Sequence, residues 1–228
     1  MKTFLIKSFA TCLLVLALIL GSASFALAND GFYLGFSYVE NNPGYGFDGD
    51  SIYSLDGYPY SMGKPMLDPG AGFTITGGMV VNPIGLEMSY TNSSHFGSCY
   101  VGTYTWDGVA SFNNIDFDMK IFMDPESSLK PYLLLGMAIP WVVVKDGEHD
   151  STTDGVTGDC TYSGIGLNLG GGIDLEVSKE LSIQGEAVYR LAGYSSASGT
   201  NVSGDLPEMF SGSGFCFTIG INYIFAGF

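Results

Sequence analysis

The chain has 228 residues, and only 14% of them are charged, compared with about 25% in a typical soluble domain. Acidic residues outnumber basic residues by 23 to 8, and the net charge of −15 argues against nucleic-acid binding through phosphate neutralisation. An apolar fraction of 46% excludes a disordered acidic tail. With 33 Gly, 16 Phe and 14 Tyr, the composition indicates a β-protein whose surface is not built for water.

The N-terminal segment has the three regions of a secretory signal peptide. A basic start with two Lys residues precedes an apolar stretch at 10–20, and Ala26-Leu27-Ala28 has the A-x-A form of a cleavage site. The apolar stretch is shorter than the roughly 20 residues of a membrane-spanning helix, and an uncleaved anchor is the alternative. We expect cleavage after 1–28, which leaves 29–228 with a net charge of −17 because two Lys and no acidic residue are lost.

The rest of the chain alternates between apolar residues and small or polar ones, which marks strands with two different faces. The run 162–177 is the clearest case, with Ile, Leu and Val on one face and mainly Gly, Asn, Asp and Glu on the other. The run 132–144 is apolar on both faces, and we expect Leu133, Leu135, Met137, Ile139 and Trp141 to point outward. The eight segments with this alternation are 32–38, 71–79, 84–90, 114–123, 132–144, 162–177, 181–191 and 215–225.

The connections between these segments alternate strictly in length. Those at 81–83, 124–130 and 178–180 are short, whereas 40–69, 91–111, 145–161 and 195–212 are long. Outer-membrane barrels have this layout of short periplasmic turns and longer external loops. The pattern predicts an all-β fold: an eight-stranded antiparallel transmembrane β-barrel, an up-and-down meander with four long extracellular loops.

A soluble β-sandwich is the alternative fold, because it also has alternating strands. Three features favour the barrel. The second face of the strands carries Gly, Ser, Thr and Asn rather than many charges, which suits a narrow lumen. Loop lengths alternate, and aromatic residues such as Tyr90, Trp141 and Tyr223 lie near strand ends, as interfacial girdles require.

The C-terminal part resembles the end of small bacterial outer-membrane β-barrel proteins of the OmpA/OmpX type, with OmpW-like proteins as near neighbours. The resemblance rests on Gly164-Ile-Gly-Leu-Asn-Leu-Gly-Gly-Gly-Ile-Asp-Leu-Glu-Val, Leu181-Ser-Ile-Gln-Gly-Glu-Ala-Val-Tyr-Arg-Leu and Gly220-Ile-Asn-Tyr-Ile-Phe. It implies a location in the cell outer membrane and insertion by the outer-membrane assembly machinery. Such chains end on an aromatic residue in phase with the outward face; Phe225 is in phase here and Phe228 is not. We expect no peptidoglycan-binding domain after the barrel.

Charged residues on the inward face form the candidate site, a polar network in the lumen. Across a three-residue turn at 178–180, Asn168 would lie opposite Arg190, and Gly172 opposite Glu186, where it leaves space for the carboxylate. Charges removed from water need partners, so we expect salt bridges that fill the lumen. Because five acids face two bases, a narrow cation-selective path is the alternative. The network residues are Glu87, Asp116, Asp118, Lys120, Asp174, Glu186 and Arg190.

The chain offers little for catalysis or for holding a metal. Some small barrels are lipid-modifying enzymes with a nucleophilic Ser and a His, but Ser93 and Ser94 beside His95 form only a weak candidate, and His149 lies in an acidic loop. We expect no catalytic residue and no cofactor. Loop 146–159 lacks the regular calcium-binding order, so we expect solvated acids there and no metal site. The five acids are Asp146, Glu148, Asp150, Asp154 and Asp159.

Three cysteines follow the signal segment. Cys99 and Cys160 are both predicted in external loops, and a disulfide between them is plausible in an oxidising compartment. Cys216 is predicted to face inward, and the sequence leaves the pairing open. The first long loop contains aromatic residues that either recognise a partner or pack on the barrel rim. They are Tyr45, Phe47, Tyr53, Tyr58 and Tyr60.

These observations favour a structural or surface-interaction protein with a largely filled lumen. The alternatives are a narrow channel or transporter for small or apolar solutes and, less favoured, a lipid-modifying enzyme. The partners expected are outer-membrane lipid and lipopolysaccharide, the assembly machinery and an extracellular molecule bound by the loops. We expect a monomer that binds no nucleic acid.

Overall fold

A computed structural model describes residues 31–44, 47, 51–53, 60–101, 104–150, 155–201 and 203–225. The predicted signal peptide and the out-of-phase Phe228 lie outside these residues. Within the described ranges, no helix has the length and apolar character to cross a membrane.

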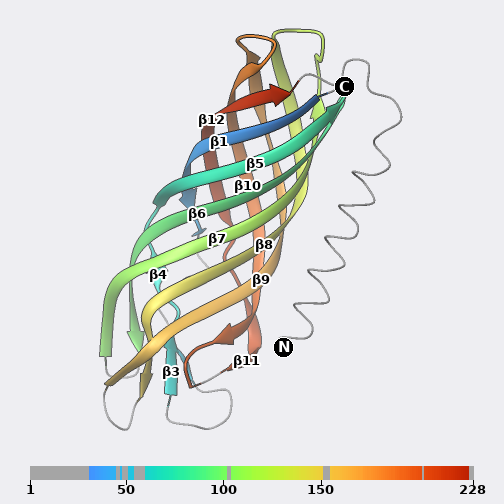
Figure 1. Cartoon of the computed structure of the whole chain (residues 1–228). Helices are drawn as coiled ribbons and strands as arrows, with labels where there is room; N and C mark the ends of the chain where they lie inside the picture. The colour runs from blue at the N-terminus through green and yellow to red at the C-terminus, as the bar shows by residue number, and fades with distance from the viewer. Residues whose placement is uncertain are drawn as a thin grey trace.

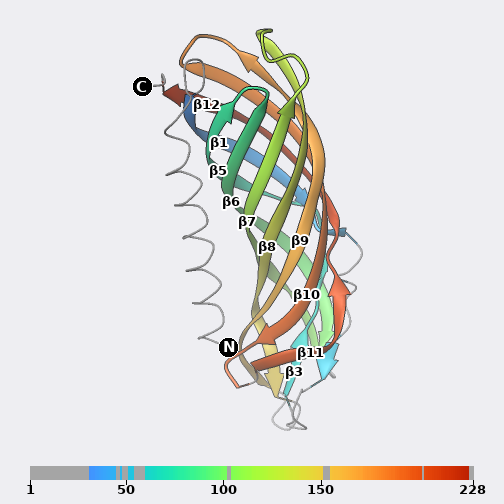
Figure 2. The same ribbon diagram turned by 90° about the vertical axis from the view of Figure 1, so that its right-hand side faces the viewer.

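Eight long strands follow one another around a ring, each antiparallel to its neighbours (Figures 1 and 2). In chain order they are β1 (Gly31–Asn42), β5 (Gly70–Val81), β6 (Ile84–Val101), β7 (Tyr104–Phe122), β8 (Leu129–Asp150), β9 (Gly155–Glu176), β10 (Leu181–Ser198) and β12 (Gly214–Phe225). Because β12 pairs with β1, the sheet has no free edge along this ring. The predicted eight-stranded antiparallel meander is confirmed.

The pairing registers give the geometry of closure. A row of directly paired residues starts at Leu129 on β8 and returns to β8 at Ile139, a shift of 139 − 129 = 10 residues. With strands about 4.8 Å apart and a rise of about 3.3 Å per residue, this shift over eight strands tilts them by about 40°. Eight strands at this tilt leave an interior that side chains can fill. The row runs through Leu129, Leu175, Ile183, Ile221, Phe36, Ile75, Tyr90, Ile115 and Ile139.

One face of each strand carries exposed apolar side chains. The expected phase of the ambiguous run is confirmed, since Leu133, Leu135 and Met137 are 50–62% exposed while Leu134 is buried. Aromatic rings border this apolar band on the side of the long connections. Tyr90 lies beside Trp141, with 6.2 Å between ring centroids. Tyr189 on β10 and Phe215 on β12 form a second pair of this kind.

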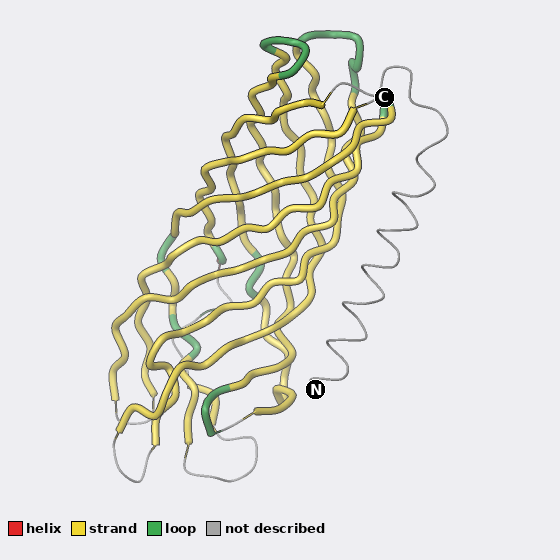
Figure 3. Tube along the Cα trace, in the orientation of Figure 1, coloured by secondary structure: helices red, strands yellow, loops and turns green. Residues whose placement is uncertain are grey.

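The long connections differ from the prediction, because most of their residues are strand. Strands β6 and β7 are separated only by 102–103, and β8 and β9 only by 151–154. The expected loops 91–111 and 145–161 are therefore mainly hairpins that prolong the barrel, as Figure 3 shows. The reason is the composition of the outer face. Beyond Tyr90 on β6 the outward side chains are mainly polar, with Phe96 as an exception, so the apolar alternation that identified the strands stops.

Short strands extend the sheet at the end of the barrel that carries the long connections, called here the loop end; the opposite end is the turn end. Strand β3 (Tyr60–Gly63) pairs with β2 (Ser51–Tyr53) and with the tip of β8, and β4 (Met66–Leu67) pairs with β6. Strand β11 (Ser203–Ser211) pairs with β10 beyond the point where β10 leaves β12. The predicted loops 40–69 and 195–212 thus contain sheet.

Inside the loop end lies an apolar core, called here the plug. Phe47 from the first loop packs against Tyr194 and Phe210, with ring centroids 5.2 and 5.3 Å away, and Lys64 lies over the Phe210 ring. Phe47 therefore packs inward, whereas the other first-loop aromatic side chains are outside the described parts. The buried plug residues are Phe47, Met62, Leu67, Cys99, Trp106, Ala110, Phe112, Val142, Val144, Cys160, Tyr162, Ala192, Tyr194, Ala197 and Leu206.

A charge in the middle of the apolar band tests its contact with lipid. Replacing the exposed Leu135 by Arg is expected to lower the free energy of unfolding by about 2–4 kcal/mol, because the guanidinium would enter hydrocarbon. Urea unfolding in phospholipid vesicles measures this. The control is Thr105→Arg, which is exposed near the loop-end tip of β7 and should change little. Equal effects of the two variants would contradict a lipid-facing band.

Candidate functional site

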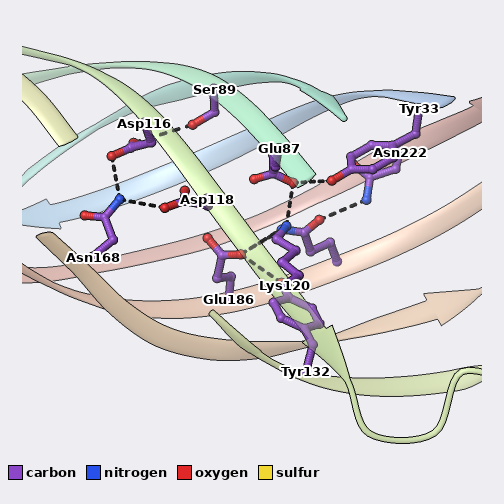
Figure 4. A network of polar contacts seen from close by, with 11 residues as sticks. Tyr33, Glu87, Ser89, Asp116, Asp118, Lys120, Tyr132, Asn168, Glu186 and Asn222 are labelled. Atoms are coloured by element: carbon purple, nitrogen blue, oxygen red, sulfur yellow. Dashed lines mark hydrogen bonds and ion pairs between the residues drawn. The ribbon is translucent and has the colours of Figure 1, made fainter. Parts of the chain in front are cut away.

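The lumen near the turn end contains a buried lysine held by two carboxylates. The Nζ atom of Lys120 lies 2.5 Å from Glu87 Oε2 and 3.3 Å from Glu186 Oε2, and the lysine is 2% exposed. The hydroxyl of Tyr33 donates to Glu87 at 2.5 Å, and that of Tyr132 donates to Glu186 at 2.9 Å. The ammonium also lies over the Tyr132 ring, 4.9 Å from its centroid. Five residues from five strands thus form one connected group (Figure 4).

A second group surrounds Arg190. Its Nη2 donates to both carboxylate oxygens of Asp116, at 3.1 and 3.0 Å, and its Nε donates to Asn168 Oδ1 at 3.1 Å. The Asn168 amide in turn donates to Asp116 at 2.6 Å and to Asp118 at 3.0 Å (Figure 4). The predicted opposition of Asn168 and Arg190 across the β9–β10 hairpin is confirmed. Ser89 adds a weak bond to Asp116 at 3.5 Å.

The two groups lie on either side of a cavity of about 20 Å³, room for about one water molecule. Both basic residues are paired, but Asp118 has no ion pair among the described residues and relies on the Asn168 amide. The lumen at this level is therefore richer in acid than in base. Such an interior needs water, a bound cation or a bound proton for charge balance.

Asp174 stands apart from these groups. It lines a larger cavity of about 110 Å³ near the turn end, whose inner wall includes Tyr33 and Lys120. A salt bridge of 2.8 Å between Lys130 and Glu176 lies at the same cavity. The structure thus joins six of the seven predicted network residues into two groups and leaves Asp174 outside them.

Glycines on the inner faces make room for this network. A Cβ atom at Gly136 would lie 1.8 Å from Asp118 Oδ1, so the carboxylate occupies the space that a side chain would need. Gly172 lies opposite Glu186 in the strand register, as predicted. The space beside Gly172 is filled by the Tyr132 ring, however, and not by the carboxylate. The tyrosine is large enough to reach across β9 and bind Glu186 from the other side.

The polar network and the plug meet at one aromatic ring. The Arg190 guanidinium lies 5.7 Å from the centroid of Phe112, which belongs to the plug. Cations bind the faces of aromatic rings, so this contact holds the arginine between its Asp116 partner and the apolar core. Together the network and the plug fill the lumen over most of its length.

The weak Ser-His candidate proves to be a buried pair. Ser93 Oγ lies 2.8 Å from His95 Nε2, and both side chains are at most 1% exposed. A nucleophile in this position has no access to a lipid ester. Ser94 points to the outer surface, and the His149 side chain lies outside the described residues.

The described acidic side chains near the β8–β9 hairpin do not form a cluster. Glu148 is fully buried and accepts hydrogen bonds from the backbone N–H groups of Thr200 and Asn201, at 3.0 Å each. Asp159 accepts one from the backbone of Asp146. Among the described residues, no three His, Cys, Asp or Glu side chains gather as metal ligands. Glu148 therefore fastens the β10–β11 connection onto β8.

Cys99 and Cys160 are buried in the plug, on strands β6 and β9. Cys216 is buried separately, in a smaller apolar cluster with Val39 and Val188. The predicted disulfide between Cys99 and Cys160 stays a prediction.

Sequence reasoning placed Asn168 opposite Arg190 on the inner face without including it among the network residues, and it missed Tyr33, Tyr132 and the whole plug. Tyr33 and Tyr132 are each in the inward phase of their strands, so alternation alone could have placed them in the lumen. The signal for the plug was a change of polarity on the inner face of β7, whose inward phase stays the same. Toward the loop end, the inward residues change from the acids Asp116 and Asp118 to the apolar Phe112 and Ala110.

Comparison with known proteins agrees with this architecture. A family model described as the outer membrane protein beta-barrel domain matches residues 11–225. The chain is similar to the outer membrane protein OprG from Pseudomonas aeruginosa, with 14% identity and a TM-score of 0.58 over 86% of this chain and 96% of that one. Neisserial surface protein A is also similar, with 16% identity and a TM-score of 0.51 over 85% of this chain and 97% of that one. A major outer membrane protein from Thermus thermophilus has 11% identity and a TM-score of 0.52 over 85% of this chain and 99% of that one. No curated protein sequence matches the chain.

Removing the buried lysine tests the network. Lys120→Ala leaves two carboxylates without their cation and is expected to lower the free energy of unfolding by about 3–5 kcal/mol in urea titrations. Lys130→Ala is the matched control, because its pair with Glu176 is partly exposed and should contribute about 1 kcal/mol or less. If both variants unfold at the same urea concentration, the lumen pair contributes no more than a surface pair.

Thiol counting tests the cysteines. Burial raises the pKa of the Cys99 and Cys160 thiols to about 12, so neither should react with iodoacetamide at pH 8 in the folded protein. After unfolding without reductant, mass spectrometry of 29–228 should count three labels if all cysteines are free and one if the predicted disulfide has formed. Labelling of Cys99 or Cys160 in the folded protein would contradict the closed plug.

Proposed function

The chain belongs to the outer membrane β-barrel family, and on that premise we propose that it is a structural and surface-interaction protein whose lumen is closed to solutes. The family sits in the outer membrane, in contact with its lipids. The structural and surface-interaction role is our proposal. Two features support it: the side chains that fill the lumen, and the sheet that projects beyond the apolar band at the loop end.

The observation that carries the proposal is closure at two successive levels. The Lys120 and Arg190 groups occupy the lumen toward the turn end, and the plug occupies it toward the loop end. Between the polar groups, the cavity has room for about one water molecule. A hydrated ion that crossed the barrel would have to separate buried ion pairs and then enter an apolar core, and both steps are unfavourable.

The prolonged strands support a surface role. Strands β6 to β9 continue well past the ring of Tyr90 and Trp141, so folded sheet projects beyond the apolar band. One similar structure bears the name of a surface protein. We propose that the loop end binds an extracellular partner and contacts lipopolysaccharide, that the chain works as a monomer, and that the outer-membrane assembly machinery inserts it.

A catalytic role is disfavoured by the position of the only Ser-His pair found among the described side chains. Ser93 and His95 are enclosed, so a lipid substrate at the outer surface cannot meet them. We therefore propose that the protein is not an enzyme.

Conductance in planar bilayers tests the closed lumen. The purified protein is expected to give no stable ion-permeable state, because both levels of closure must open at once. A double variant, Lys120→Ala with Phe112→Ala, weakens both levels and should show openings, whereas Lys130→Ala with Leu135→Ala should not. Long-lived openings of the unmodified protein would overturn the proposal and favour the narrow channel.

A further inference from the structure

His95 lies in a directional chain of hydrogen bonds at the border between the network and the plug. Its Nδ1 atom is 2.9 Å from the backbone carbonyl oxygen of Asp68, which can only accept, so Nδ1 carries the proton. The neutral ring then has its lone pair on Nε2 and accepts from the Ser93 hydroxyl at 2.8 Å. Asn41 completes the chain by donating its side-chain N–H to Ser93 Oγ at 3.2 Å.

These hydrogen bonds fasten the segment 66–69 of the first loop to the barrel wall. The Asp68 N–H donates to the Phe96 carbonyl at 2.8 Å while its own carbonyl accepts from His95. Gly70 lies so close that a Cβ atom there would be 2.5 Å from His95 Nδ1. Strand β4, which precedes Asp68, pairs with β6 at two residues only, and Leu67 is buried in the plug. The His95 bond to the Asp68 carbonyl therefore acts together with the Asp68 N–H bond at the end of this short attachment.

The surroundings of the ring oppose a positive charge. His95 is 1% exposed, and it packs edge-on against Phe112, whose ring also contacts the Arg190 guanidinium. The Asp68 carboxylate is on an exposed residue, β1 presents the neutral Asn41, and β5 presents Gly70. Burial lowers the pKa of His95 below its ordinary value, against a smaller opposing effect of the Asp68 carbonyl.

We propose that His95 is an acid-sensitive fastener, which holds the segment 66–69 on β6 while its ring is neutral and releases it when the ring is protonated. A proton on Nε2 turns that atom into a donor, so Ser93 would have to accept from both His95 and Asn41. The Ser93 proton then has an acceptor only if the Asn41 amide rotates to turn its Oδ1 toward the hydroxyl. The released segment can expose the imidazolium to water, which the fastened state cannot do.

The sign of the pH effect follows from this difference. The fastened state binds the proton more weakly than the released state, whose histidine has the ordinary pKa of about 6.5. The equilibrium therefore shifts toward release as the pH falls below about 6.5, by up to about tenfold per pH unit. This device is independent of whether the lumen conducts.

Hydrogen–deuterium exchange tests the fastener in the whole protein in lipid. After correction for the intrinsic exchange rate, protection of the Asp68 amide is expected to fall by up to about tenfold between pH 7.5 and 5.5. His95→Gln keeps an amide donor but cannot titrate, so its protection should not change with pH. His149→Gln is the control and should behave as the unmodified protein. Protection that is independent of pH in the unmodified protein, or equally dependent in His95→Gln, would overturn the proposal.

Imidazole titration supplies a second test that does not depend on the folding of His95→Gln. The chain has two histidines, so His149→Gln leaves the NMR signals of one imidazole. These signals are expected to titrate below pH 6.5, together with the loss of Asp68 protection. A normal or raised pKa, or titration that leaves the protection unchanged, would contradict the fastener.

Discussion

The structure depends on one constraint, the pairing of every backbone donor and acceptor in a sheet whose outer face is apolar. In hydrocarbon no water can satisfy a free strand edge, so β12 must meet β1. Closure of eight strands with a shift of ten residues fixes the tilt and makes the lumen narrow. Side chains of ordinary size then meet across it, and this is why Lys120 can contact Glu87 near its own strand and Glu186 on the far wall.

The narrow lumen is used in two different ways along its length. Where the outer face is apolar, the inner face is polar, and buried charges are arranged in the Lys120 and Arg190 groups. Beyond the ring of Tyr90 and Trp141 the outer face becomes mainly polar, and the inner face carries the apolar core. The protruding part of the barrel is thus organised like a small water-soluble β-protein. His95 lies at the junction, where the first loop is attached to the wall.

Much of the fold could be predicted from alternation and turn spacing. The eight strands, their order and the outward phase of Leu133 and Leu135 were all accessible, because a lipid-facing surface imposes a strict period of two. The pairing of Asn168 with Arg190 followed from the three-residue turn between their strands. The extent of β6 to β9 was underestimated, since polar residues such as Ser94 replace apolar ones on the outer face beyond the lipid.

The sequence by itself determined which residues face inward, and it therefore assigned acids in excess of bases to the lumen. Only the tertiary structure decided how they combine. Pairing between neighbouring strands follows from local turns, but contacts across the lumen depend on the shift accumulated around all eight strands. The curvature of the sheet and the registers of the intervening strands brought Tyr132 across β9 to Glu186, placed Arg190 on Phe112 and left Asp174 outside both groups. For the same reason, the enclosure of Ser93 and His95 became visible only when the first loop was placed against β6.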